Sequence, residues 1–86
     1  MTITKKETLC ALGRLVKQHR VNVGISQEEL ALRAHLDRTY VSGVERGVRN
    51  PSLTALVSLA SGLGITVSEL LEGLEAEVNV QQHRKN

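Results

Sequence analysis

A short stretch near the middle of the chain concentrates the side chains that could bind a polyanion. Residues 36–52, LDRTYVSGVERGVRNPS, contain three arginines and Tyr40, in a chain with no Phe or Trp. Leu36, Val41 and Val44 recur at helical spacing, so the stretch is too patterned for a loose loop and too polar for a core. Guanidinium groups bind phosphates and guanine edges through paired hydrogen bonds. The stretch therefore predicts a DNA-reading helix.

A DNA-reading helix presents its N-terminal residues to base edges in the major groove. Arg38 can donate to guanine O6 and N7, and Thr39 can offer a hydroxyl or a methyl group. Gly43 permits close approach but has no side chain, so we expect fewer direct base contacts and more readout of DNA shape. A solvated position is the alternative for Arg38, and a partly buried core position is the alternative for Tyr40. The candidate base readers are Arg38, Thr39, Tyr40, Ser42 and Gly43.

Other polar residues are candidates for contacts with the DNA backbone. Gln27 begins a predicted helix, where the side chain and backbone N–H groups can meet a phosphate. Arg46 and Arg49 flank the end of the predicted reading helix. For Arg33, ordinary solvation is the preferred interpretation.

The elements that must position these residues are predicted to be helices. Capping-box spacing occurs at residues 4–7, 26–29 and 66–69, and Asp37 can cap a further helix. We expect helices over residues 5–22, 27–34, 38–46, from 51 or 52 to Gly62 or Gly64, and from 67 onward through Leu74. No convincing strand is predicted, so the fold class is all-α.

Residues 27–46 fit two short helices joined by a three-residue turn. Ala31 supplies a small residue where the two helices must approach closely. His35 occupies the turn position that often requires a positive φ, and histidine is among the non-glycine residues that adopt it.

Length and composition exclude several classes of protein. Eighty-six residues indicate one domain, residues 1–78, with a frayed tail at 79–86. The single cysteine, Cys10, rules out a disulfide within the chain, and the three scattered histidines predict no metal site. No phosphate loop or nucleophile–base motif is present, so we expect neither an enzyme nor a cofactor. With no secretory signal and no apolar run long enough for a bilayer, we expect no membrane contact and a reduced cytoplasmic setting.

Charge and apolar spacing indicate two surfaces. Residues 1–50 hold nine Lys/Arg and five Asp/Glu, a net +4, whereas residues 51–86 hold two and four, a net −2. The acidic part carries leucines at helical spacing that a small domain cannot easily cover. They predict either a homodimer interface or the completion of the monomer core. The set comprises Leu63, Leu70, Leu71, Leu74 and Val78.

The motifs SQEELA, VSGVERG and RNPSL together resemble the helix-turn-helix of the phage-repressor (lambda repressor and Cro, XRE-type) superfamily, from about Leu12 to Leu71. LDRTYVSGVER is similar to the controller proteins of restriction–modification systems. The resemblance implies a five-helix lambda-repressor-like domain that regulates transcription as a homodimer on a palindromic operator, with RNA polymerase as a further candidate partner. It also implies an Arg20–Glu45 pair that ties the first helix to the reading helix and aims Arg20 at a phosphate. Two independent surface charges are the alternative for that pair, and an antitoxin-like or adaptor module is the alternative function.

Overall fold

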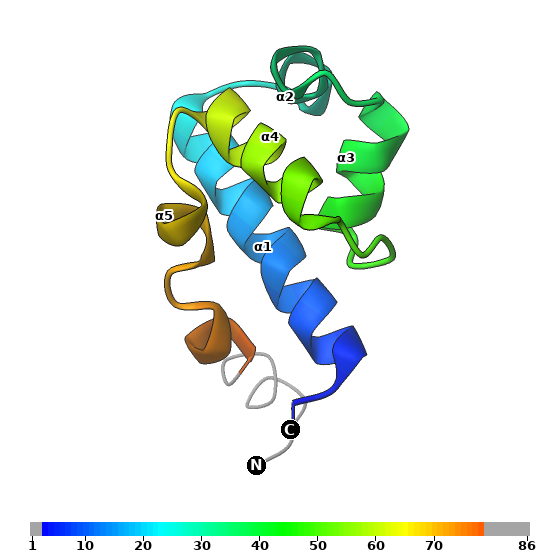
Figure 1. The fold of residues 1–86 in the computed structure, drawn as a ribbon, viewed down its shortest axis with the longest axis vertical. Helices are drawn as coiled ribbons and strands as arrows, with labels where there is room; N and C mark the ends of the chain where they lie inside the picture. Colours follow the sequence, from blue (N-terminus) through cyan, green and yellow to red (C-terminus); the bar gives the residue numbers. More distant parts are fainter. Residues whose placement is uncertain (1–2, 79–86) are drawn as a thin grey trace.

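The computed structural model describes residues 3–78, which form a bundle of short helices (Figure 1). Residues 74–78 are helical again after the last named helix, and no strand occurs within the described range. The predicted all-α class is therefore confirmed, and the tail predicted at 79–86 lies outside the described residues. The helices are α1 (Lys5–Val23), α2 (Gln27–Ala34), α3 (Arg38–Glu45), α4 (Leu53–Leu63) and α5 (Val67–Leu71).

Local capping signals fix where several helices begin. Thr4 and Glu7 form a reciprocal capping box at the start of α1, each backbone N–H donating to the other side chain over 3.0 Å. Thr66 and Glu69 do the same at α5, over 2.9 and 3.0 Å. Each box satisfies backbone N–H groups that a helix start leaves without partners.

Two predicted caps are only partly formed. Ser26 accepts from the backbone N–H of Glu29, but the Glu29 carboxylate pairs with Arg33 one turn later at 2.9 Å instead of returning to the cap. Asp37 occupies the N-cap position of α3 without a side-chain hydrogen bond to the helix. The Glu29–Arg33 ion pair thus competes with the hydrogen bond that the Glu29 side chain would otherwise accept from the Ser26 backbone N–H.

The fifth helix is shorter than predicted. It ends at Leu71, because Gly73 adopts a left-handed φ of 79° and turns the chain before residues 74–78 become helical again. The turned segment lies along α1, where Arg14 and Glu77 form an ion pair at 2.9 Å.

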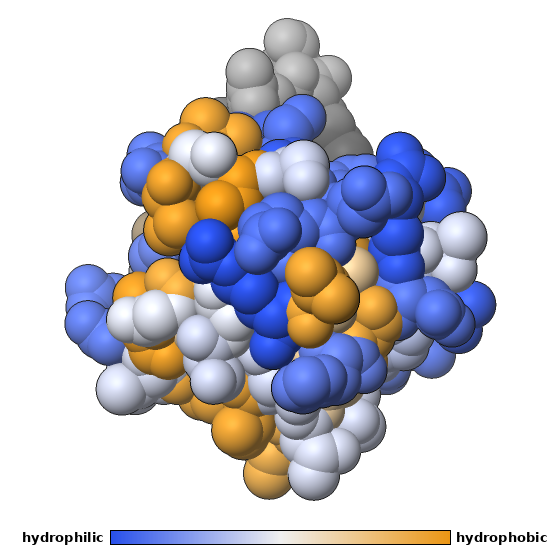
Figure 2. Space-filling view, turned by 90° about the horizontal axis from the view of Figure 1, so that it is seen from above, coloured by the Kyte–Doolittle hydropathy of each residue, from blue (hydrophilic) through white to orange (hydrophobic). Residues whose placement is uncertain are grey.

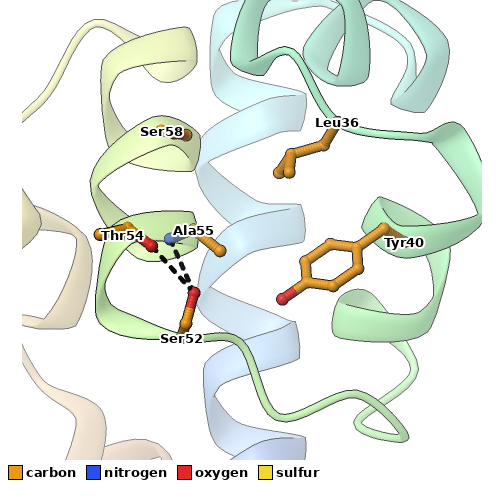
Figure 3. Close-up of a pocket in the computed structure, with 6 residues that line it drawn as sticks. All are labelled: Leu36, Tyr40, Ser52, Thr54, Ala55 and Ser58. Carbon is orange, nitrogen blue, oxygen red and sulfur yellow. Dashed lines mark hydrogen bonds between the residues drawn. The ribbon is translucent and has the colours of Figure 1, made fainter.

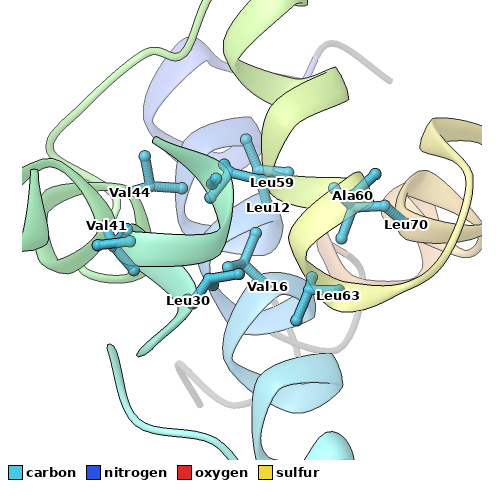
Figure 4. Close-up of a cluster of buried hydrophobic side chains, with 11 residues drawn as sticks. Leu12, Val16, Leu30, Val41, Val44, Leu59, Ala60, Leu63 and Leu70 are labelled. Carbon is cyan, nitrogen blue, oxygen red and sulfur yellow. The ribbon is translucent and has the colours of Figure 1, made fainter. Parts of the chain in front are cut away.

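Buried side chains from all five helices meet in one core (Figure 4). α2 packs against α3 and α4, and α1 contacts α3, α4 and α5. The core therefore holds α3 from several sides while leaving its outer face free. The cluster comprises Leu12, Val16, Leu30, Ala31, Ala34, Val41, Val44, Leu59, Ala60, Leu63 and Leu70.

α1 and α3 approach each other closely at Gly13. A Cβ added at Gly13 would lie 2.4 Å from the carbonyl oxygen of Glu45 and 2.6 Å from that of Val44. These are backbone atoms at the C-terminal end of α3, so the absence of a side chain at residue 13 sets how near the two helices can lie.

Within residues 3–78, no individual helix is both long enough and apolar enough to cross a membrane. The pair formed by Leu53–Leu63 and Val67–Val78 meets the criterion by length and composition alone, and it is bent by 97°.

Candidate nucleic-acid interface

α2 and α3 form the two-helix unit that the sequence predicts. His35 has φ 57° and ψ 41°, the left-handed conformation expected for the turn, and its backbone N–H returns to the end of α2. Ala31 is only 4% exposed, and Val41 and Val44 are fully buried, so the two helices pack closely. This packing fixes the angle at which α3 presents its outer face.

The predicted base readers differ in how accessible they are. Arg38 and Thr39 are exposed at the first turn of α3, whereas Tyr40 and Ser42 are half-buried. Gly43 is buried, because the Arg49 side chain covers it. Close approach of DNA to the Gly43 backbone would therefore require the Arg49 side chain to move.

A hydrogen-bonded network joins α3 to both preceding helices. Arg20 of α1 donates to both carboxylate oxygens of Glu45, from Nε at 2.7 Å and from Nη2 at 3.1 Å. Its Nη1 donates to the backbone carbonyl of Ile25 at 2.9 Å. Gln27, the first residue of α2, donates from Nε2 to Glu45 at 2.9 Å. The predicted Arg20–Glu45 pair is thus formed, and Gln27 is part of it.

The Arg20–Glu45 pair is largely buried. The Arg20 and Glu45 side chains are only 13% and 4% exposed. The hydrogen bonds to Glu45 raise the pKa of Arg20, against the opposing effect of burial. Since three nitrogen atoms of Arg20 already donate within the protein, this geometry favours a positioning role over a phosphate contact. The Gln27 side chain also donates to Glu45, so its geometry likewise favours a positioning role over a phosphate contact.

Two arginines extend the outer face of α3 beyond its end. Arg46 is exposed and donates from Nε to the Ser42 hydroxyl at 3.3 Å. Arg49 is exposed, and its Cζ atom lies 5.5 Å from the centre of the Tyr40 ring. Exposed guanidinium groups directly after the C-terminal end of α3 fit a surface that meets a polyanion.

A shallow groove beside α3 was not predicted as part of the site. Tyr40 and Leu36 face the first turn of α4 across this groove, where Ser52 and Thr54 offer hydroxyl groups (Figure 3). The Ser52 hydroxyl accepts from Ala55 N–H at 3.2 Å, which caps α4. The only sequence signal was the cap at Ser52, because the approach of α4 to α3 depends on the tertiary fold.

The leucine surface proposed for dimer contact is largely internal. Leu63, Leu70 and Val78 are 4%, 0% and 1% exposed within a single chain, so they have almost no surface to offer a partner. This burial favours the alternative of a monomer core for these three residues over a dimer interface. Leu71 and Leu74 are partly buried against the core and keep some exposed area.

The remaining surface shows no cluster with metal-ligand chemistry. In the range 3–78, no three His, Cys, Asp or Glu side chains come together as possible ligands.

Seen from the α2 end, hydrophilic groups surround separate hydrophobic patches (Figure 2). Leu32 of α2 is 71% exposed.

Comparison with known proteins shows the family to which the two-helix unit belongs. Residues 16–70 match the family model described as "Helix-turn-helix". The control protein C.MunI from Mycoplasma sp is 45% identical over 65 residues, which cover 76% of this chain and 88% of that protein. The chain spans only 50% and 63% of the length of two further regulators that it resembles.

Solved structures of similar proteins agree with the fold. The restriction–modification controller protein C.AhdI from Aeromonas hydrophila is 47% identical, with a TM-score of 0.71 over 72% of this chain and 94% of that one. The controller protein C.Esp1396I, solved as a tetramer with its natural 35-base-pair operator, is 35% identical, with a TM-score of 0.75 over 83% of this chain and 93% of that one.

Proposed function

Because the chain belongs to the helix-turn-helix family, we propose that it is a sequence-specific, double-stranded-DNA-binding regulator of transcription and not an enzyme. One observation supports this above all. Among residues 3–78, three arginines form ion pairs with carboxylates and three do not. The three without such pairs, Arg38, Arg46 and Arg49, lie on α3 or directly after it. Cationic side chains left available on one helix fit the phosphates and base edges of a major groove.

The role proposed for each residue in DNA binding follows from how exposed its side chain is. Arg38 and Thr39 read bases at the N-terminus of α3, with Tyr40 and Ser42 beside them. Arg46 contacts the phosphate backbone of the DNA. Glu45, held by Arg20 and Gln27, fixes the orientation of α3.

Selection of bound sites from random duplex DNA tests the function directly. The wild-type chain should enrich a short palindrome. Arg38→Ala should weaken binding to that palindrome by about 5- to 150-fold and relax one base pair per half-site. Arg14→Ala is the matched control, because Arg14 is an exposed arginine paired with Glu77 away from α3. Failure to enrich any sequence would refute the proposal.

We further propose a homodimer that places two α3 helices about 34 Å apart on the duplex. Leu71 and Leu74 remain as contact residues, because both are apolar and only partly buried. Leu74→Asp should shift sedimentation towards the monomer and weaken palindrome binding while keeping the helical circular dichroism spectrum. A folded, fully dimeric variant would place the interface elsewhere.

The relatives named as controller proteins favour a restriction–modification operon as the target, in the cytoplasm. RNA polymerase is the proposed partner there. Transcription from a promoter carrying the selected palindrome, with purified polymerase and increasing regulator, tests both proposals. No change in transcript level would refute them.

A further inference from the structure

Asp37 is the only aspartate of the chain and lies at the N-cap position of α3, directly before Arg38 and Thr39. Aspartate is among the residues that cap helices best, because its carboxylate accepts from a backbone N–H of the first turn. Here the Asp37 side chain is exposed and makes no such hydrogen bond, and it forms no ion pair within residues 3–78. Its carboxylate is therefore available to a group outside the protein.

The N-cap side chain of α3 differs in this respect from those of the other named helices. In each of α1, α2, α4 and α5, the N-cap hydroxyl accepts from the backbone N–H three residues later, at 3.0–3.2 Å. At α3 the equivalent N–H belongs to Tyr40, and it donates to the backbone carbonyl of Asp37 at 3.0 Å. The Asp37 carbonyl has thus taken the donor that its carboxylate would use as a cap.

The backbone on both sides of Asp37 is held in place. Leu36, which packs against the hydrophobic core, donates from its backbone N–H to the Ala31 carbonyl at 2.9 Å. After Asp37, the backbone N–H groups of Tyr40 and Val41 donate to its carbonyl, at 3.0 and 3.2 Å. Asp37 is therefore fixed relative to α3 through its backbone, while its carboxylate stays unused by the described part of the chain.

A free carboxylate is unfavourable on a surface that binds DNA. It repels the phosphates, and it can accept hydrogen bonds but donate none. Glu45, the acidic residue within α3, is instead buried and paired with Arg20. The exposed carboxylate of Asp37, beside the proposed base readers, therefore opposes binding unless the duplex brings a donor to it.

The major groove offers few such donors. Only the exocyclic amino groups of cytosine, at N4, and of adenine, at N6, donate there, whereas guanine N7, guanine O6 and thymine O4 accept. An acidic side chain matches cytosine N4, and the neighbouring Arg38 matches the two guanine acceptors. Asp37 and Arg38 together therefore fit cytosine and guanine at the start of α3.

Resting on the proposed DNA binding, we propose that Asp37 is a specificity-determining residue whose carboxylate accepts a hydrogen bond from cytosine N4 in the major groove. Cytosine satisfies the carboxylate, whereas a base that presents an acceptor at the same place repels it. The cap of α3 is left unmade, and this keeps the carboxylate free for the base.

Asp37→Ala separates base reading from two simpler roles, a helix cap and a charge that repels phosphates without touching a base. Binding is measured on the palindrome selected by the wild type and on duplexes with one base pair changed in each half-site. Reading of cytosine predicts opposite changes, namely about tenfold weaker binding to the palindrome and tighter binding to duplexes that lack the cytosine. Loss of a cap would weaken binding to every duplex, and loss of a repelling charge would tighten binding to every duplex.

Replacing that cytosine with N4-methylcytosine tests the donor atom itself. The methyl group takes the place of the N4 hydrogen that faces the groove and leaves the hydrogen that pairs with guanine. The wild type should bind the methylated palindrome about tenfold more weakly, whereas Asp37→Ala should bind both forms alike. Glu75→Ala is the matched control, because it removes an exposed carboxylate outside α2 and α3, and it should respond to the methyl group as the wild type does.

A second variant shows whether a change in folding explains the result. Asp37→Gly also lacks the carboxylate, but glycine is an adequate N-cap residue, so it should show the same opposite changes as Asp37→Ala. A uniform change on all duplexes, or an Asp37-dependent preference for adenine, would overturn the cytosine contact and leave the proposed function standing. A wild-type chain that enriches no sequence would instead refute the proposed function itself.

Discussion

Replacing Gly13 with alanine should test whether the contact between α1 and α3 sets the position of the proposed reading helix. The added Cβ would lie 2.4 Å from the Glu45 carbonyl oxygen, and ordinary contact begins near 3.4 Å. One helix must therefore retreat by about 1 Å from a backbone atom, which cannot rotate away as a side chain can. Arg20 lies two turns further along α1, so the same movement would disturb its pairing with Glu45.

Two opposing effects determine the size of the change at Gly13. Alanine is the better helix former by about 1 kcal/mol in a helix interior. Overpacking in a close contact costs about 1–3 kcal/mol, and a backbone obstacle places this case at the upper end or beyond it. We expect a net loss of about 2 kcal/mol in the free energy of unfolding. For a domain of this size, that corresponds to a fall in Tm of about 8–16 °C.

Thermal unfolding followed by circular dichroism would measure the effect of Gly13→Ala. Gly43→Ala is the control, because it is another buried glycine inside a helix and the three atoms nearest to its added Cβ belong to the Arg49 side chain, not to the backbone. The control should lower Tm by less than Gly13→Ala does. An unchanged or higher Tm for Gly13→Ala would show that the crossing of α1 and α3 relaxes freely, and the positioning argument would be refuted.

Three further predictions concern the hydrogen-bonded network around Glu45, the hydrophobic core and the pH dependence of stability. Glu45→Ala should lower the free energy of unfolding by about 3 kcal/mol in denaturant titrations, because it leaves the buried Arg20 charge without its carboxylate. A loss below about 1 kcal/mol would mean that the Arg20–Glu45 pair contributes no more than an exposed surface pair. Leu70→Ala should cost about 2–5 kcal/mol without changing the oligomeric state of the folded protein, and a stable monomeric variant would return Leu70 to the interface. Hydrogen bonds from the backbone N–H and hydroxyl of Thr66 lower the pKa of Glu69 below its usual 4.5, so its stabilising contribution is complete above that pH and is lost as pH falls through the lowered pKa. The stability difference between the wild type and Glu69→Gln should therefore disappear on acidification, and a difference that persists at low pH would contradict this.

The helices could be predicted from sequence because their signals are local. Thr4 with Glu7 and Thr66 with Glu69 form capping boxes whose partners are three residues apart. His35 adopts the left-handed turn that its position required. Each of these features depends on neighbouring residues alone, so tertiary packing does not alter it.

The sequence did not show in the same way what covers the apolar side chains of residues 63–78. Helical spacing shows that Leu70 and Val78 are buried, but it does not say whether one chain or two bury them. Here the turn at Gly73 brings residues 74–78 alongside α1, and both side chains are covered within one chain. Glycines were ambiguous for a similar reason. Gly13 and Gly43 leave space for a backbone and for a distant arginine, and no local pattern distinguishes these uses from a turn.

The structure separates the residues that position α3 from those that we propose read DNA. Gly13, Arg20 and Glu45 are buried or nearly so, and their partners are other protein groups. Arg38 and Thr39 are exposed, and surface substitutions away from packed features usually change stability by less than about 0.5 kcal/mol. Substitution of the exposed pair should therefore alter sequence preference while leaving Tm almost unchanged, whereas substitution of the buried set should lower Tm first. A chain built this way can acquire a new operator without refolding its scaffold.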